Sequence, residues 1–285
     1  MSAAKGQSFP TSKIGFIGWS QQSAAVLEAL KKGRPGEPHA MPWLPLEPSG
    51  QMSAVDPAPN PRGLSTLPSV EAIFETCDLL FLAPPPEAMD ALLPLMRLSI
   101  SDRHTIVLLG MGWSLMPVLQ HLQERKLVRA LMAEFPATGA ILMTYYASPY
   151  LGQTDREKFG GLFSHLDLAL EMPTEAQFDA AMGLVGFAPA AFYTLMEALA
   201  DGALVAGMRR DEARKLIAAM LSHTAGSMLH GEAHPATLRE EALTDPAAAA
   251  ALQELEVSGT RGVMMRALEK GLRELTRRRQ SKTTK

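Results

Sequence analysis

Cysteine is almost absent from this chain of 285 residues, which contains Cys77 alone. A single cysteine excludes an intrachain disulfide and is typical of a reducing compartment. The chain also lacks a strong charge of either sign, since its formal net charge is −3, and this does not indicate a nucleic-acid partner. We find neither a signal-peptide core near the N-terminus nor an uninterrupted apolar run of the ~18 residues that span a membrane. We therefore expect a cytoplasmic protein with no nucleic-acid and no membrane partner.

The residues that are present have the composition of a globular protein, with 47% hydrophobic and 20% charged residues. Up to about residue 170, short apolar runs alternate with helical patterns, which is typical of a parallel sheet built from βαβ units. The predicted strands are 13–18, 78–83 and 105–110, with weaker candidates at 127–131, 140–145 and 166–170. The predicted helices between them are 21–32, 71–76, 87–96 and 115–125.

The segment 34–68 interrupts this rhythm with nine prolines. Proline removes the backbone donor that a central strand needs, so a strand here would be poorly paired. Residues 41–46 are the candidate for the second strand, and we predict a long irregular excursion for the rest.

From residue 174 onward the periodicity is helical, so we predict a first domain over 1–173 and a helical domain over 174–285. Thr174 and Gln177 have the spacing of a capping box. A long apolar helix is predicted over 189–205 and stops at Gly207. We expect Asp211 to cap the next helix, which runs to 229. A short helix is predicted from Pro235 and the last one from Pro246.

These helices carry more apolar surface than a monomer of this size covers easily, which favours an intertwined homodimer. The alternative is a monomer in which the helices form a cap on the sheet. The basic tail over 273–285 is typical of a solvated helix end.

Three segments of the helical part carry a family resemblance: P-A-A-F-Y-T-L-M-E-A-L-A-D over 189–201, H-P-A-T-L-R-E-E-A-L-T-D-P over 234–246, and G-T-R over 259–261. In that order and at those spacings they resemble the dimerisation domain of the pyrroline-5-carboxylate reductase family. That family reduces a cyclic imine to proline with a nicotinamide cofactor. The resemblance implies an α/β Rossmann-type N-terminal domain followed by an all-α C-terminal dimerisation domain. It also implies a homodimer or higher homo-oligomer that forms through the C-terminal helices.

The loop after the first predicted strand departs from the dinucleotide pattern G-x-G-x-x-G/A, in which glycines allow the pyrophosphate to approach the backbone. Residues 18–23 read G-W-S-Q-Q-S, whereas the family's usual loop resembles G-A-G-N-M-A. Gly18 matches that loop, and Ser20 and Ser23 do not. Ser20 adds a side chain at the pyrophosphate, although its hydroxyl is also able to bind phosphate. Trp19 is bulky enough to close over the loop or to fill the site.

Other matches to the family's nucleotide domain are partial. Residues 81–86 (F-L-A-P-P-P) resemble F-L-A-V-K-P, and residues 128–137 resemble V-R-A-M-P-N-T-P-A, keeping Arg129 and Pro136. Glu47 lies about where an acidic residue would hold the ribose hydroxyls, although it is in the proline-rich stretch. The cofactor expected from the resemblance is NAD or NADP, and its predicted contacts are Gly18, Trp19, Ser20, Gln21, Glu47, Ala83 and Pro84.

The family's substrate segments are strongly altered. Segments that resemble S-G-S-G-P-A-Y and T-S-P-G-G-T-T in the family read V-G-F-A-P-A-A over 185–191 and T-D-P-A-A-A-A over 244–250. Both serines of the first segment have become apolar, and alanine replaces both glycines and both late threonines of the second. Loss of one donor of this kind typically lowers a rate by ~10²–10³-fold. The run of alanines also favours plain helix over a loop.

Few polar candidates for catalysis survive. They are Thr244, Asp245 and Tyr193, and each has a structural alternative, as a helix cap for the first two and a core aromatic for the third. Glu197 and Asp201 are equally consistent with a structural role at the dimer interface. We expect no metal site, because helix-breaking residues separate His230 from His234.

Two functions follow from these observations. The first is an NAD(P)H-dependent reductase of a cyclic imine with an altered active site. The second is a catalytically inactive paralogue that acts as a dimeric scaffold or ligand-sensing protein.

Overall fold

The computed structural model describes residues 13–34, 41–45, 64–84, 88–110, 114–123, 125–231 and 233–283, with side chains as far as residue 277. The chain divides into two compact units, which we describe separately. One contains residues 1–182 together with 275–285, and the other contains 183–274.

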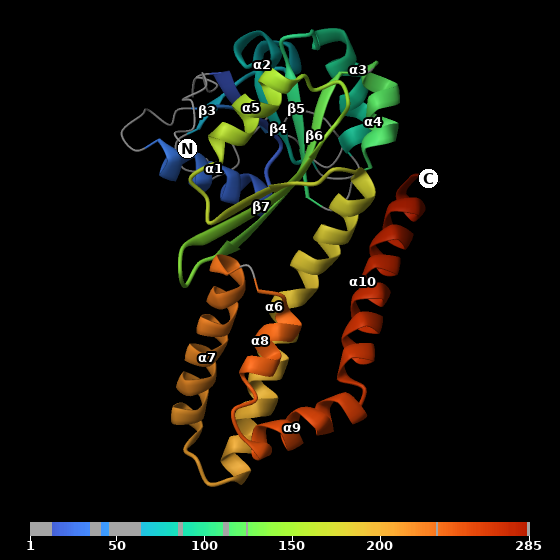
Figure 1. The fold of residues 1–285 in the computed structure, drawn as a ribbon. Helices are drawn as coiled ribbons and strands as arrows, with labels where there is room; N and C mark the ends of the chain where they lie inside the picture. Colours follow the sequence, from blue (N-terminus) through green and yellow to red (C-terminus); the bar gives the residue numbers. More distant parts are fainter. Residues whose placement is uncertain are drawn as a thin grey trace. The chain divides into compact units, whose positions relative to one another are not determined.

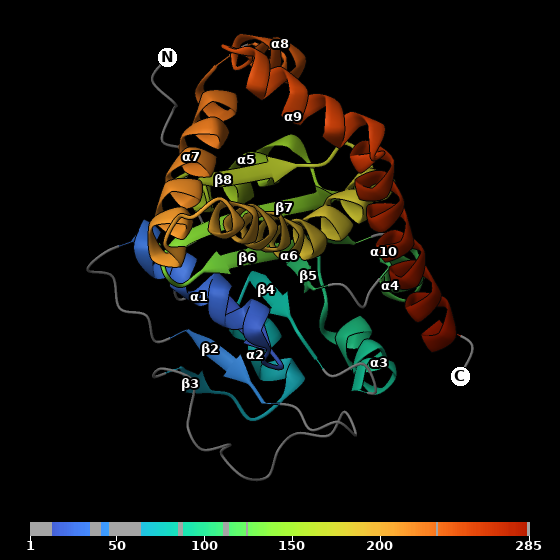
Figure 2. The same cartoon turned by 90° about the horizontal axis from the view of Figure 1, so that it is seen from below.

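The first unit is built on an eight-stranded sheet in the order β3-β2-β1-β4-β5-β6-β7-β8 (Figures 1 and 2). All neighbouring strands are parallel except β6 and β7, which form an antiparallel hairpin. The strands are β1 Ile14–Ile17, β2 Pro42–Leu44, β3 Ser65–Thr66, β4 Leu79–Leu82, β5 Thr105–Leu109, β6 Lys126–Phe135, β7 Ala140–Ala147 and β8 Leu168–Glu171.

Helices cover both faces of this sheet. The core on one face packs under α1 and α5, and the core on the other packs under α2, α3 and α4. The central strands are buried on both faces, which explains why they read as continuous apolar runs in the sequence. The helices are α1 Gln21–Gly33, α2 Val70–Thr76, α3 Met89–Ser99, α4 Leu115–Leu122 and α5 Gln153–Leu162.

The predicted α/β Rossmann-type fold is confirmed, with corrections in detail. The sheet is not wholly parallel, because β6 extends to Phe135 and turns back into β7. The pattern analysis missed β3 and α5. The predicted second strand, β2, is present but short. Its Trp43 pairs with Phe16 of β1 on one side and with Thr66 of β3 on the other.

The segment after the sheet is all-helical, as predicted, but the helices have different bounds. They are α6 Glu175–Val205, α7 Arg210–His230, α8 Pro235–Glu241, α9 Pro246–Val257 and α10 Thr260–Thr283. The prediction of a helix from 189 was wrong, because α6 begins earlier and runs through Pro189. The Oγ1 atom of Thr174 accepts a hydrogen bond from the backbone N–H of Gln177, 3.2 Å away, as the capping pattern predicted.

Three further helix predictions have mixed outcomes. Gly207 follows α6 with φ +97°, a conformation that favours glycine after a helix, so the predicted stop is confirmed. Asp211 was predicted to cap α7, but the N-cap is Arg209, and Asp211 lies in the first turn. α9 is not the last helix, since α10 follows it. The functional division between 1–173 and 174–285 stays a prediction.

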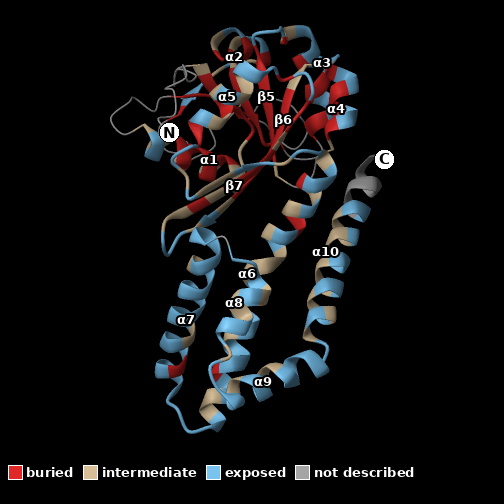
Figure 3. Ribbon diagram, in the orientation of Figure 1, coloured by how far each residue is buried: buried red, intermediate tan, exposed pale blue. Residues whose placement is uncertain are grey.

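The second unit exposes many apolar side chains, and in Figure 3 its helices are mostly pale or tan whereas β5 and most of β6 are red. Leu184, Leu199, Met220, Leu229 and Met265 are all more than half exposed. By length and composition alone, α6 would be able to cross a membrane. Only 17% of its most apolar 18-residue stretch is buried in the single chain. An exposed apolar face of this extent also marks a protein interface.

Candidate functional site

The predicted cofactor loop lies where the carboxyl ends of three strands meet. The backbone N–H of Gly18, just after β1, donates to the Leu44 oxygen of β2 at 2.9 Å. The N–H of Ala83, just after β4, donates to the Ile17 oxygen at 2.9 Å. Strand order runs in opposite directions from β1 and β4, so this edge is the topological switch point at which doubly wound sheets bind ligands.

Gly18 occupies a position that no other residue fits. Its φ is +71°, and a Cβ atom there would lie 2.7 Å from the Ala83 carbonyl oxygen and 2.9 Å from the Pro84 Cα. The turn therefore needs glycine both for its backbone conformation and for its close approach to the end of β4. The fold thus brings together three residues that sequence analysis proposed from separate motifs: Gly18, Ala83 and Pro84.

Ser20 caps α1 by a reciprocal arrangement with Ser23. The Ser20 Oγ accepts from the Ser23 N–H at 3.4 Å, and the Ser23 Oγ accepts from the Ser20 N–H at 3.3 Å. The two serines that depart from the glycine-rich pattern therefore satisfy two backbone donors at the helix start. Because the Ser20 oxygen acts as acceptor in this box, its own proton is available to a further acceptor.

Gln21 and Gln22 supply the remaining donors of this turn. Within the described part of the chain, their backbone N–H groups donate to no partner. The Gln21 side chain is exposed, whereas that of Gln22 bonds to the backbone of Met132. Sequence analysis did not predict a role for Gln22, because its partner is 110 residues away.

Trp19 packs against the core instead of standing over the loop. Its ring lies 5.4 Å from that of Phe16 and 6.2 Å from that of Trp43, measured between centroids. Glu47, the predicted ribose contact, lies outside the described residues. The described end of β2 is apolar, since Trp43, Leu44 and Pro45 are buried there.

These features fit a dinucleotide pyrophosphate. Gly18 lets the chain turn tightly against the end of β4 into the start of α1, where two N–H groups donate to no partner among the described residues. The positive end of the helix dipole favours the same anion. Gly18, Gln21 and Gln22 would hold the pyrophosphate, and the Ser20 hydroxyl lies beside them.

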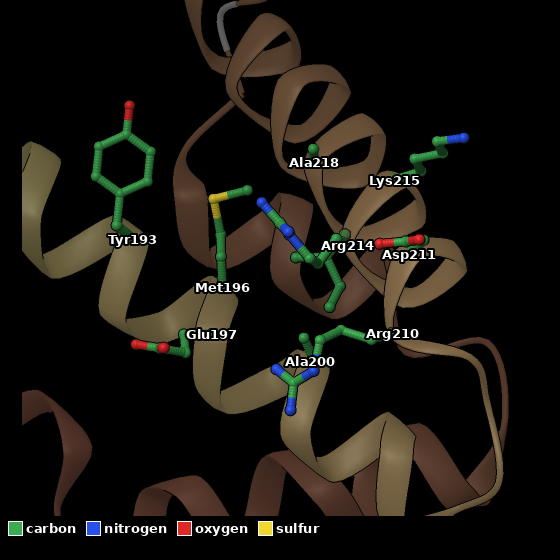
Figure 4. Close-up of a pocket in the computed structure, with 10 residues that line it drawn as sticks. Tyr193, Met196, Glu197, Ala200, Arg210, Asp211, Arg214, Lys215 and Ala218 are labelled. Carbon is green, nitrogen blue, oxygen red and sulfur yellow. The ribbon is translucent and has the colours of Figure 1, made fainter.

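Tyr193 lies in the helical unit and lines a cavity of about 860 Å³ between α6 and α7. Figure 4 shows its ring beside Met196, with the Arg214 side chain extending from α7 toward the same space. The Tyr193 side chain is 67% exposed, so the alternative of a core aromatic is wrong for the single chain. Arg210, another lining residue, forms an ion pair with Asp201 at 3.0 Å.

Thr244 and Asp245 precede α9 and do not line that cavity. The Asp245 Oδ1 accepts from the N–H groups of Ala247 and Ala248 at 2.7 and 3.0 Å, so Asp245 is the helix cap. The alanine run that replaces the family's loop is the first turn of α9, as the sequence predicted. The Thr244 side chain is exposed.

Arg129, which the sequence shares with the family, is buried in β6 and holds the start of α6. Its Nη1 lies 2.5 Å from Glu175 and 2.9 Å from Asp179, and its guanidinium lies over the Phe178 ring at 4.7 Å. Glu175 also accepts from the Leu115 N–H at 2.7 Å. These contacts indicate a structural role for Arg129.

Comparison with known proteins supports the resemblance drawn from the motifs. Residues 175–277 match the model of the pyrroline-5-carboxylate reductase dimerisation domain. The chain is 28% identical over 261 residues to pyrroline-5-carboxylate reductase 3 of Xenopus laevis, covering 90% of this chain and 92% of that protein. It is 27% identical over 272 residues to the pyrroline-5-carboxylate reductase of Pseudomonas aeruginosa, covering 90% and 93%.

The chain is therefore similar to the pyrroline-5-carboxylate reductase family over about nine tenths of its length. Solved structures agree with this fold. The Coxiella burnetii pyrroline-5-carboxylate reductase superposes with a TM-score of 0.76 at 19% identity, covering 94% of this chain and 99% of that one. The Plasmodium falciparum pyrroline carboxylate reductase, solved with NADP bound, has a TM-score of 0.74 at 18% identity and covers 94% and 98%. Within this family, residues 175–277 are the dimerisation domain.

Proposed function

We propose that this protein is a cytoplasmic NAD(P)H-dependent reductase of a cyclic imine, with a substrate pocket more apolar than that of the family. The observation that carries this proposal is the turn at Gly18, at the switch point of the sheet, where two amides at the start of α1 donate to no partner among the described residues. Relatives named pyrroline-5-carboxylate reductase supply the substrate class.

The residues of the sheet unit would bind and orient the cofactor. When bound, the nicotinamide supplies the hydride. The amides of Gln21 and Gln22 would donate to the pyrophosphate, and Ser20 would add its hydroxyl where the family's loop has glycine. Ala83 and Pro84 would line the opposite wall of the turn, and Glu47 is our candidate for the ribose hydroxyls.

The substrate end differs more from the family. Val185, Phe187 and the alanines from Ala247 onward replace hydroxyls and glycines, so these two segments contribute few donors for a substrate carboxylate. Reduction of an imine still requires a proton for its nitrogen. Thr244 and Tyr193 carry hydroxyls that form no hydrogen bond with another described side chain, and they are our candidates for this role. An apolar cyclic imine is the substrate class that fits these replacements.

We also propose that the active form is a homodimer or a higher homo-oligomer through the C-terminal helices. The matched domain is named for dimerisation, and its apolar side chains are extensively exposed in the single chain. Burial of these side chains against a second copy would remove them from water.

A second candidate function is a catalytically inactive paralogue that acts as a dimeric scaffold or ligand-sensing protein. It is favoured by one specific observation: Ala247 and Ala248 form the first turn of a helix capped by Asp245, where the family's segment resembles a glycine-rich loop. Alanine at those positions closes the backbone approach that glycine allows.

The first experiment is titration of the purified protein with NADH and NADPH, followed by calorimetry and by the fluorescence of Trp19 and Trp43. Saturable binding at micromolar concentration, followed by imine-dependent oxidation of the reduced cofactor, would support the reductase. Cyclic imines with and without a carboxylate should be compared directly. Binding of neither cofactor, together with failure to rescue a proline auxotroph, would leave the inactive paralogue as the better proposal. The Ser20→Gly variant then tests whether Ser20 is the obstacle to binding.

A further inference from the structure

Strand β6 extends beyond the end of its neighbour β5, and the backbone of β6 has no described strand partner on that side close to the cofactor loop. Pairing between β5 and β6 extends to Leu109 and Ala130, and the last backbone bond joins the Gly110 N–H to the Ala130 oxygen at 3.1 Å. The next residue of β6 whose backbone groups face the same edge is Met132. A backbone N–H and C=O there need a partner, since buried peptide groups are rarely left unpaired.

The side chain of Gln22 provides that partner. Its Nε2 donates to the Met132 oxygen at 2.9 Å, and its Oε1 accepts from the Met132 N–H at 2.7 Å. A primary amide carries one donor and one acceptor in the geometry of a peptide group, so it continues the ladder where β5 stops. The side chain reaches β6 past Gly110, where a Cβ atom would lie 3.9 Å from the Gln22 Cγ.

The same residue contributes to the cofactor turn. Gln22 is the second residue of α1, and its backbone N–H is one of the two that donate to no described partner. Two hydrogen bonds from its side chain therefore fix the position of a backbone donor that faces the pyrophosphate. The family's usual loop, which resembles G-A-G-N-M-A, has methionine at this position, and methionine cannot make either bond.

We propose that Gln22 is a positioning residue that fastens the cofactor loop to β6 and holds its amides in the binding conformation. This inference rests on the proposed cofactor site. In this chain Ser20 stands where the family's loop has glycine and Ser23 where it has alanine, and the connection from Gln22 to Met132 compensates by fixing the first turn of α1. Removal of the connection lowers the fraction of molecules in the competent conformation, and the apparent cofactor affinity falls by the same factor.

The test uses the full-length protein and two matched variants. Gln22→Met removes both hydrogen bonds, keeps the volume and restores the residue of the family's loop. Gln120→Met makes the same change on an exposed glutamine of α4, outside the cofactor loop, and is the control. We measure the Kd for NADH and NADPH by calorimetry, and the hydrogen exchange of the Met132 amide in the absence of cofactor.

We expect Gln22→Met to weaken cofactor binding by about tenfold, as for loss of roughly one net hydrogen bond, and to speed exchange at Met132. Gln120→Met leaves both quantities unchanged. Unaltered affinity in Gln22→Met with faster exchange at Met132 would make the contact purely structural and overturn the proposal. Unaltered exchange at Met132 would show that the connection does not exist in solution, with the same consequence.

A measurement on the unmodified protein covers the case in which Gln22→Met does not fold. Saturating NADH or NADPH should slow exchange at the Met132 amide, because coupling between two sites is reciprocal. An unchanged rate at saturation overturns the positioning role alone. Absence of binding by the unmodified protein refutes the cofactor site itself, and the proposed reductase falls with it.

Discussion

Substitution of Gly18 by alanine tests the central element of the cofactor turn. The variant must place a side chain at φ +71°, which costs an L-residue about 1–2 kcal/mol. The new Cβ would also lie 2.7 Å from the Ala83 oxygen and 2.9 Å from the Pro84 Cα, and backbone atoms cannot rotate away. Overpacking of this kind adds roughly 1–3 kcal/mol. We therefore expect the free energy of unfolding to fall by about 2–5 kcal/mol.

The assay is urea denaturation of Gly18→Ala beside a control variant at a glycine that has neither a positive φ nor a close neighbour for the new Cβ. Gly161 lies in α5 of the same unit, and a Cβ added there meets no atom within 4 Å. Gly161→Ala should be neutral or more stable than the unmodified protein by about 0.5–1 kcal/mol, because alanine suits a helix better than glycine.

Cofactor titration of the folded Gly18→Ala protein completes this test. The alanine must push the end of β4 away from the turn, so we expect weaker binding of NADH and NADPH. A stability within about 0.5 kcal/mol of the unmodified protein would refute the reasoning, because the strain and the overlap would then both be absent.

Three further predictions concern the sheet unit. Arg129→Met should lower the free energy of unfolding by roughly 3–5 kcal/mol in urea denaturation, because it leaves Glu175 without its buried cation. Arg273→Met breaks an exposed ion pair and should change the free energy of unfolding little. Equal losses in the two variants would contradict a special role for the buried Arg129. Burial lowers the pKa of His104 below its usual 6.5, so folding favours the neutral ring, and the unfolded chain binds the proton more readily. The contribution of His104 to the free energy of unfolding is complete above about pH 6.5 and is lost as the pH falls. In the same urea series, the free energy of unfolding of His104→Gln should depend less on pH. Burial also raises the pKa of the Cys77 thiol to about 12, so iodoacetamide should label Cys77 only in denaturant; rapid labelling of the native protein, detected by mass spectrometry, would show that the thiol is accessible.

Much of the secondary structure could be read from the sequence, because its signals are local. Buried parallel strands appear as unbroken apolar runs, as in β4 and β5, and capping residues such as Thr174 and His234 mark helix starts. The predictions failed where tertiary pairing decides, as in β3, which is a strand only because it pairs with β2. Helix α6 continues through Pro189 although proline removes a hydrogen bond, and the turn over 136–139 that joins β6 to β7 was missed although its glycine, Gly139 at φ +69°, is a local signal.

The candidate site divides in the same way. By itself, the sequence indicated the family resemblance and the position of the candidate cofactor loop, since motif order and spacing are properties of the chain. It could not say how the loop tolerates serine in place of glycine. Only the tertiary structure decided that Gly18 must be glycine, because the end of β4 lies against it. Only the tertiary structure joined Gln22 to Met132, because parallel strands bring together segments that are far apart in sequence.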